Sequence, residues 1–114
     1  IVLGGDYNIC PTKNDVANEN MILNDAVYQE ESKNLFRKIC NAGFFDAFRS
    51  LHSNNGFTYW DYGQAYQSNL GIRIDHFLLS SYALDSLSAI YVDETPRKQK
   101  KTSDHAPIVA NFSF

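Results

Sequence analysis

Cysteine is scarce in this sequence: Cys10 and Cys40 lie far apart, and no CxxC pair suggests zinc binding or thiol redox chemistry. Two isolated cysteines form no disulfide framework, so we expect reduced thiols in a cytosolic protein. No apolar run approaches the ~20 residues that a membrane-spanning helix needs. The chain also opens without the basic region of a secretory signal, because Ile1-Val2-Leu3 passes straight into Gly4-Gly5. These absences predict a cytoplasmic protein without a membrane partner.

Two catalytic signatures are also missing. No serine stands in a GxSxG elbow, which argues against a serine hydrolase, and no lysine follows Gly4-Gly5 to make a phosphate-binding loop. Positive charge is in slight deficit, because 10 Lys and Arg against 13 Asp and Glu give a formal net charge of −3. This balance argues against broad nucleic-acid binding, so any contact with DNA has to come from a local basic patch.

Apolar and charged residues are present in ordinary amounts, 44% and 20% of the 114 residues, which excludes a disordered tail and a coiled coil. The length allows one domain or part of one. Periodicity predicts a helix over 30–42 and a long polar loop over 8–26, with residues 44–52 fitting a helical turn or a strand and 81–87 one helical turn. The expected strands are 1–3, which should be buried, 57–62, 72–80, 88–92 and 108–112.

These elements predict an α/β (α+β) fold with one mixed β-sheet and helices on its outer face. One good helix scarcely covers a sheet of about five strands, so the sheet needs a further layer. The start of the chain points the same way, because its apolar residues suggest a strand entered from outside and no initiator Met precedes them. We therefore expect the chain to be a piece of a longer protein.

Three polar clusters stand next to strand ends or inside a strand. In the first, Asp6 and Asn8 are two residues apart, so on an extended backbone both side chains point to the same side. A carboxylate can orient or deprotonate water, and an amide can donate to a phosphate or a developing oxyanion. The alternative interpretation is ordinary turn chemistry at Gly4-Gly5-Asp6.

The second cluster lies inside the best predicted strand, where Asp75 needs a partner because a buried carboxylate is costly without one. An ion pair with Arg73 is one interpretation, and a hydrogen bond accepted from a histidine, which would fix its tautomer, is the other. His76 points to the opposite face of the strand and is the poorer partner. The third cluster, Asp104-His105, offers a carboxylate and an imidazole together, or else is a surface loop with an incidental histidine.

Carboxylates, an amide and a histidine without cysteine ligands favour a hard divalent ion such as Mg²⁺. Carboxylate-held Mg²⁺ beside a base is the equipment for phosphodiester hydrolysis. Immediately before the third cluster, the basic run of Arg97, Lys98, Lys100 and Lys101 would place positive charge beside a scissile phosphate, unless it is a plain solvated loop.

In order and spacing, these clusters resemble the motifs of the exonuclease III and abasic-endonuclease family, within the exonuclease–endonuclease–phosphatase superfamily. Gly5–Asn8 (GDYN) with Pro11-Thr12 resembles the GDFN-x-xPT signature. The further similar stretches are Asp46–Arg49 (DAFR), Thr58–Tyr62 (TYWDY), Gly71–His76 (GIRIDH) and Ser103–Pro107 (SDHAP). GDxN and SDH also recur in sphingomyelinases, inositol phosphatases and deadenylases, whereas DAFR, TYWDY and GIRIDH point to the nuclease branch.

The resemblance implies a role for each polar residue. Asp6 resembles the residue that activates the attacking water, and Asn8 the amide that holds the scissile phosphate. His105 resembles the histidine that binds the phosphate and stabilises its developing charge, with a general base as the alternative role, and Asp75 resembles the carboxylate that orients it. Asp104 corresponds to a carboxylate near the metal and the DNA. The implied metal ligands are Asp6, Asn8, Asp104 and His105, holding Mg²⁺ or Mn²⁺.

The resemblance also implies DNA contacts. Trp60 and Ile72 fall on stretches that approach the extruded abasic sugar in the family, where an apolar wall favours a deoxyribose without its base. Trp60 is equally well explained as a core aromatic. The expected DNA-binding residues are Trp60, Ile72, Arg73, Lys98, Lys100 and Lys101. Gly63 departs from relatives that carry an arginine after the TYWDY stretch, which removes one phosphate contact.

Residues 1–114 as a whole resemble the C-terminal half of the family's four-layer α/β sandwich. The N-terminal half, with the main metal-binding glutamate, is not in the chain, so we expect the isolated chain to be inactive or nearly so. The expected partners are duplex DNA with abasic sites or 3′ ends, the N-terminal half of the same protein, and a second copy through an exposed sheet face.

The implied function is Mg²⁺-dependent phosphodiester hydrolysis in duplex DNA, as a 3′–5′ exonuclease and abasic-site endonuclease of base-excision repair, in a cytoplasmic, nucleoid-associated protein. Two alternatives stay open at this point. One is a phosphoesterase of the same fold acting on a lipid or inositol phosphate, and the other is a catalytically dead DNA-binding piece.

Overall fold

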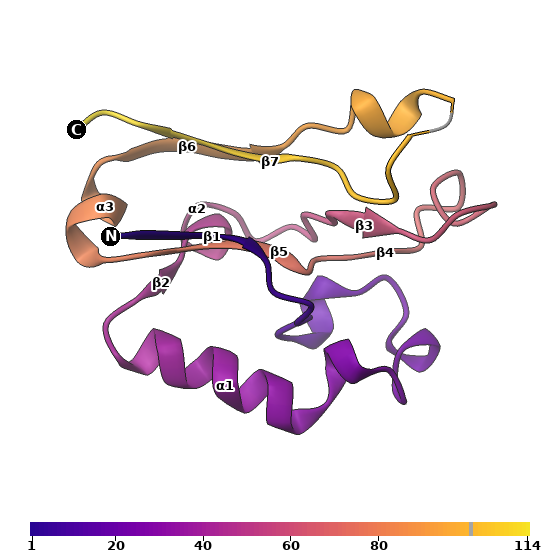
Figure 1. The fold of residues 1–114 in the computed structure, drawn as a ribbon, viewed down its shortest axis with the longest axis horizontal. Coiled ribbons are helices and arrows are strands. Elements are labelled where there is room, and N and C mark those ends of the chain that lie inside the picture. The colour runs from indigo at the N-terminus through magenta and orange to yellow at the C-terminus, as the bar shows by residue number, and fades with distance from the viewer. Residues whose placement is uncertain (101) are drawn as a thin grey trace.

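Short antiparallel sheets form the framework of the chain, of which the computed structural model describes residues 1–100 and 102–114 (Figure 1). The strands are β1 (Val2–Asp6), β2 (Phe45–Asp46), β3 (Tyr59–Trp60), β4 (Gly71–Ile72), β5 (Asp75–Leu79), β6 (Leu87–Val92) and β7 (Ile108–Phe112). They pair in the orders β1-β5-β2, β3-β4 and β6-β7, and every one of these pairings is antiparallel. The α/β class is confirmed, but the expected single mixed sheet is a set of antiparallel pieces.

Helices flank these sheets. The α-helices are α1 (Glu30–Asn41), α2 (Ala47–Leu51) and α3 (Ser81–Asp85), and the 3-10 turns are η1 (Lys13–Asp15), η2 (Glu19–Met21), η3 (Ala26–Tyr28) and η4 (Pro96–Lys98). In Figure 1, α1 runs along the lower side of the layer that holds β1 and β5, and the β6–β7 ribbon runs along its upper side. Both chain termini lie at the same end of the molecule.

The helix predicted over 30–42 is α1. Glu30 and Glu31 lie in its first turn, where negative charge suits the positive end of the helix dipole. The helix stops before Gly43, whose φ of 110° is a left-handed conformation that a glycine adopts without strain. Phe36 is the buried residue of this helix and packs edge-on to His76, with the two ring centroids 5.0 Å apart.

The segment 44–52 contains both predicted alternatives in succession, β2 and then α2. The chain changes from strand to helix at Asp46. The Asp46 carboxylate accepts a hydrogen bond from the Arg49 backbone N–H at 3.3 Å and so caps α2. The strand predicted over 72–80 is interrupted at Arg73 and Ile74, which separate β4 from β5. The predicted turn at 81–87 and the strands at 88–92 and 108–112 are confirmed as α3, β6 and β7.

β5 is the central strand, with β1 on one edge and β2 on the other. Its consecutive residues Leu78 and Leu79 are both fully buried, which confirms a strand covered on both faces. Leu79 packs with Phe48 of α2 and Ile90 of β6 in a buried apolar cluster. β5 therefore anchors the layer from which Asp75 projects at its first residue.

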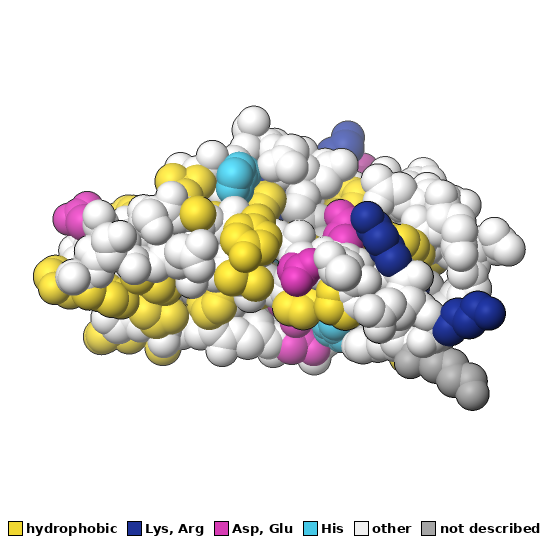
Figure 2. Space-filling view, turned by 90° about the horizontal axis from the view of Figure 1, so that it is seen from above, with side chains coloured by type: hydrophobic (Ala, Val, Ile, Leu, Met, Phe, Trp, Pro, Cys, Tyr) yellow, Lys and Arg dark blue, Asp and Glu magenta, His cyan; other side chains and the backbone are white. Residues whose placement is uncertain are grey.

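β1 corrects one expectation. The sequence predicts a buried strand at 1–3, but every residue of β1 is exposed, because it is the edge strand among the described residues. Exposed apolar side chains gather near it; Ile1, Tyr82 and Phe114 are 71%, 69% and 73% exposed. Seen from above, Figure 2 shows apolar side chains at one end of the molecule and Lys and Arg in the opposite half.

The cysteines behave as the sequence predicts. Cys10 and Cys40 are both free thiols, and burial raises the pKa of the Cys10 thiol to about 12. Cys10 is therefore a core residue rather than a nucleophile. Within the described residues, no helix combines the length and the apolar character needed to cross a bilayer.

Candidate active site

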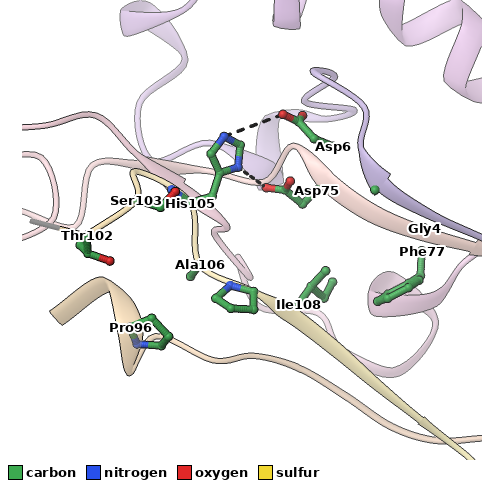
Figure 3. A pocket seen from close by; sticks show the side chains of 12 residues that line it. Gly4, Asp6, Asp75, Phe77, Pro96, Thr102, Ser103, His105, Ala106 and Ile108 are labelled. Carbon is green, nitrogen blue, oxygen red and sulfur yellow. Dashed lines mark hydrogen bonds and ion pairs between the residues drawn. The ribbon is translucent and has the colours of Figure 1, made fainter. Parts of the chain in front are cut away.

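The three predicted clusters meet where β1 ends and β5 begins. The register of these two strands places Asp6 opposite Asp75. His105 reaches the pair from the loop before β7: its Nδ1–H donates to Asp75 Oδ2 at 2.8 Å, and its Nε2 lies 3.8 Å from Asp6 Oδ2 (Figure 3). The predicted histidine partner of Asp75 is thus His105 and not its neighbour His76.

Local backbone structure holds the first cluster in place. Asn8 has a φ of 51°, a left-handed conformation that asparagine tolerates better than most residues, and its backbone N–H donates to Asp6 Oδ1 at 2.9 Å. Gly4 allows β1 to approach β5, because a Cβ there would overlap the Phe77 ring. Turn chemistry therefore exists at this point, and it fixes the Asp6 carboxylate beside His105.

Electrostatics favour a charged His105. Partial burial lowers the pKa of its imidazole, but the hydrogen bond and charge of Asp75, together with the charges of Asp6 and Asp104, raise that pKa above its usual value. Asp104 Oδ1 lies 3.9 Å from His105 Nε2. The imidazole therefore stays protonated to a higher pH than a free histidine and presents positive charge to the groove.

The donor set fits a divalent cation. One carboxylate oxygen each of Asp6 and Asp75 and a ring nitrogen of His105 lie within 4.8 Å of one another. Hard carboxylate oxygens are the ligands that Mg²⁺ and Mn²⁺ prefer. Asn8 and Asp104 as further metal ligands stay predictions.

The site opens into a groove with a volume of about 820 Å³, a size typical of ligand-binding clefts. Figure 3 shows the two faces of this groove: His105, Asp6 and Asp75 lie together on one side, and the side chains of Pro96 and Ile108 lie on the other. A charged end and an apolar wall suit a ligand with both a phosphate and a less polar part.

Arg73 lies in a different place from either prediction made for it. Its guanidinium is 1% exposed and donates to Asp15 Oδ1 at 2.7 Å and to Asp46 at 3.0 and 2.6 Å. Arg49 also donates to Asp15. The interpretation that Arg73 forms an ion pair with Asp75 is therefore wrong, and burial of this side chain argues against the predicted DNA contact.

The two apolar residues expected near the sugar are also buried. Trp60 is 1% exposed, and its Nε1–H donates to Asn69 Oδ1 at 3.2 Å, as befits a core aromatic. Ile72 belongs to the buried cluster that includes Cys10 and Ile74. Sugar contacts from Trp60 and Ile72 are therefore predictions that this burial does not favour.

The residues of the basic run differ in burial. Arg97 is buried, donates to the backbone carbonyls of Trp60 and Asp61, and lies over the Tyr66 ring. Lys98 and Lys100 are exposed and available to a phosphate backbone. Lys101 lies outside the described residues.

Sequence reasoning missed two residues that contact the site. The Tyr59 ring packs edge-on to the His105 imidazole, with centroids 5.2 Å apart. The Thr58 hydroxyl accepts the backbone N–H of Asp75 at 3.1 Å. The only signal for either was its place in the TYWDY stretch, since nothing in the residue types marks Tyr59 as a neighbour of His105 or Thr58 as a partner of Asp75.

Comparison with known proteins agrees with this geometry. Residues 1–105 match the Endonuclease/Exonuclease/phosphatase family. The chain is 34% identical over 111 residues to the DNA repair nuclease APEX1 of Danio rerio, a match that covers 95% of this chain and 34% of that protein. It is 31% identical over 121 residues to exodeoxyribonuclease III of Haemophilus influenzae, covering 98% of this chain and 45% of that protein.

The fold gives the same answer. The structure of an AP endonuclease from Archaeoglobus fulgidus matches with a TM-score of 0.93 at 32% identity, over 99% of this chain and 45% of that one. The chain thus spans less than half the length of each of these relatives. With the family match running from β1 through His105, the chain belongs to the Endonuclease/Exonuclease/phosphatase family, on the branch of exodeoxyribonuclease III and the AP endonucleases.

Proposed function

We propose that this chain is the C-terminal half of a Mg²⁺-dependent DNA-repair nuclease that hydrolyses phosphodiesters in duplex DNA, 5′ to abasic sites and at 3′ ends. The observation that carries the proposal is His105 held between Asp75 at 2.8 Å and Asp6 at 3.8 Å. The names of the relatives support the substrate, since they are a DNA repair nuclease, an exodeoxyribonuclease and an AP endonuclease.

Each side chain has one task in this proposal. Asp6, which is exposed, faces solvent and accepts a proton from the attacking water. The Asn8 amide donates to a non-bridging oxygen of the scissile phosphate. His105, kept protonated by Asp75, binds the same phosphate and stabilises the charge that develops on it. When bound, Mg²⁺ would supply Lewis-acid polarisation of a phosphoryl oxygen, and the Asp6 carboxylate would help to hold it here.

The missing half supplies the rest. Relatives are more than twice as long as the chain, and the exposed β1 edge offers unpaired backbone groups to a further strand. We propose that an N-terminal half pairs there and completes the metal-ligand set. The cytoplasmic, nucleoid-associated location belongs to the same proposal.

The test uses the full-length protein, in which this chain continues from its N-terminal half. The substrate is a duplex with one abasic site, incubated in Mg²⁺ and in EDTA. We expect incision 5′ to the site, abolished by EDTA and reduced about 10²- to 10⁴-fold in Asp6→Asn. Asp85→Asn, an exposed carboxylate at the end of α3, is the matched control and should cut at the wild-type rate.

Other outcomes identify the alternatives. Hydrolysis of an inositol or lipid phosphate without incision of DNA would assign a phosphoesterase of the same fold. Duplex binding without any hydrolysis, unchanged in Asp6→Asn, would assign a catalytically dead binding piece.

A further inference from the structure

Thr58 immediately precedes β3, directly between the two segments that carry Asp75 and His105. Its side chain is fully buried, although it is polar. It takes no part in the groove, and the resemblance to relatives assigns it no role. We propose that Thr58 is the positioning residue that sets the distance between Asp75 and His105.

Every polar group of Thr58 is used in this connection. Its backbone N–H donates to the Ile72 carbonyl at 2.9 Å, and its carbonyl accepts the Ala106 N–H at 2.8 Å. Its hydroxyl accepts two backbone N–H groups, those of Ile74 and Asp75, each at 3.1 Å. One residue thus holds the chain on both sides of the Asp75–His105 hydrogen bond, whose partners are 30 positions apart.

The hydroxyl replaces strand pairing at a break in the sheet. β4 ends at Ile72 and β5 begins at Asp75, so the backbone leaves its ladder between the two strands. Buried backbone N–H groups need an acceptor, and the two N–H groups at this break find the same hydroxyl oxygen. This oxygen has two lone pairs, so it can accept both hydrogen bonds at once.

The other side of Thr58 leads to the histidine. Ala106, which donates to the Thr58 carbonyl, follows His105 directly, and Trp60 donates its backbone N–H to the Asp104 carbonyl at 3.0 Å. The histidine loop is therefore bonded to β3 on both sides of His105. A shift of Thr58 would move Asp75 and His105 relative to each other, although neither of these side chains is hydrogen-bonded to Thr58.

Two substitutions separate the hydroxyl from the shape of the residue. Thr58→Val keeps the shape and removes the acceptor, whereas Thr58→Ser keeps the acceptor. Ser80→Ala is the matched control, because it removes another hydroxyl that accepts a backbone N–H, that of Ala83, at the start of α3 away from the site. All are made in the full-length protein and measured well below the unfolding temperature.

The spectroscopic arm needs no substrate. In the metal-free protein, the His105 Nδ1–H donated to Asp75 should give a low-field proton NMR signal, assigned by its absence in His105→Gln. We expect Thr58→Val to lose or shift this signal, and Thr58→Ser and Ser80→Ala to keep it. In the unsubstituted protein, the amide protons of Ile74 and Asp75 should exchange as slowly as those in the middle of β5.

The kinetic arm rests on the proposed function. On the abasic duplex, Thr58→Val should lower kcat about 10- to 100-fold with KM changed less than about twofold, because misplacement of a catalytic group affects the chemical step. Thr58→Ser should restore most of kcat. If the wild type cuts no abasic duplex, the proposed function fails while the NMR arm still decides the role of Thr58.

Three results would overturn the inference. One is an unchanged Nδ1–H signal in folded Thr58→Val, and another is an equal loss of that signal in Ser80→Ala, which would show general destabilisation. The third is fast exchange at Ile74 and Asp75, which requires no variant and so holds even if Thr58→Val fails to fold.

Discussion

Among the groups that raise the pKa of His105 in the groove, Asp75 contributes most. Asp75 accepts the Nδ1–H of His105 at 2.8 Å, which leaves Nε2 directed to the side of Asp6. This arrangement raises the pKa of His105 despite the partial burial that opposes it. A protonated imidazole binds a phosphate more strongly than a neutral one, so the geometry favours phosphate binding over the alternative role as a general base.

The contribution of this pair to stability should depend on pH. Because the pKa of His105 is raised in the folded state, the stabilisation is complete below the unfolded value of ~6.5 and is lost as pH rises through the folded value. Asp75→Asn should therefore reduce the free energy of unfolding by about 1 kcal/mol more at pH 5.5 than at pH 9. Urea denaturation in EDTA measures this difference.

Two variants make that measurement specific. Asp85→Asn should show the same free-energy loss at every pH, since this exposed carboxylate lies on α3. His105→Gln should remove the pH dependence of the Asp75→Asn effect. A loss that grows with rising pH would contradict the direction assigned here.

At this scale, sequence reasoning succeeded with Asp75 and failed with Arg73. Strand alternation made His76 the poorer partner of Asp75, and the resemblance to the nuclease family implied His105 instead. Alternation could not reveal Asp15 as the partner of Arg73, because it comes from a loop 58 residues earlier. A buried charge predicts that an oppositely charged partner exists. The residues next to it in the sequence do not identify that partner.

Among the elements, the buried ionic network explains why the long predicted strand is broken. Arg73 lies between β4 and β5, where the predicted strand is interrupted. It forms salt bridges with Asp15 of η1 and with Asp46, which precedes α2. Burial lowers the pKa of the Arg73 guanidinium, but the hydrogen bonds and charges of Asp46 and Asp15 raise it overall. These contacts fasten the polar loop after β1, and with it Asn8, to the sheet.

Removal of Arg73 should therefore affect stability and not DNA affinity. Arg73→Met leaves Asp46 without its cation and Asp15 with Arg49 alone, and we expect a loss of about 3–5 kcal/mol in the free energy of unfolding, measured in urea. Duplex binding by the folded variant should stay within about twofold of wild type.

The matched control is a double variant of exposed lysines, which should affect DNA affinity and not stability. Lys98→Ala with Lys100→Ala should leave stability within about 0.5 kcal/mol, because these side chains are exposed. It should weaken duplex binding and reduce its salt dependence by about two phosphate contacts. A large loss of DNA affinity in Arg73→Met, with stability intact, would restore Arg73 as a DNA contact.

Element types followed from the sequence more readily than burial did. The predicted helix at 30–42 and the predicted strand at 57–62 located α1 and β3 to within a few residues. The prediction that β1 is buried was wrong. Its apolar residues predict a covering layer, and none of the described residues supplies one. The apolar pattern of a strand predicts that one of its faces is buried. It does not predict which part of the protein buries that face.

For the molecule as a whole, the exposed apolar end beside β1 is the feature that we expect to govern association between chains. Val2 and Leu3 are 41% and 37% exposed along an edge that can still pair with another strand. We predict that the isolated chain self-associates through this edge and has little or no hydrolytic activity. Sedimentation velocity should give a mass that rises with concentration above the monomer value of 13.0 kDa.

A charge on the edge tests that prediction. Val2→Lys should shift the chain toward monomer, since lysine opposes edge-to-edge pairing. Leu35→Lys, on the exposed side of α1, changes an apolar residue that is 58% exposed and should leave association unaltered. A monomer at every concentration in the unsubstituted chain would contradict the prediction.

The pairing of β1 with β5 also orders events in time. Asp6 is synthesised before its neighbour Asp75, and His105 follows later still, at ~5–20 residues per second. Until then β1 has no partner within the described chain, and pairing across so long a separation is slow. The cluster of Asp6, Asp75 and His105 therefore assembles only after His105 has been made, and a nascent chain that stalls before residue 105 lacks it.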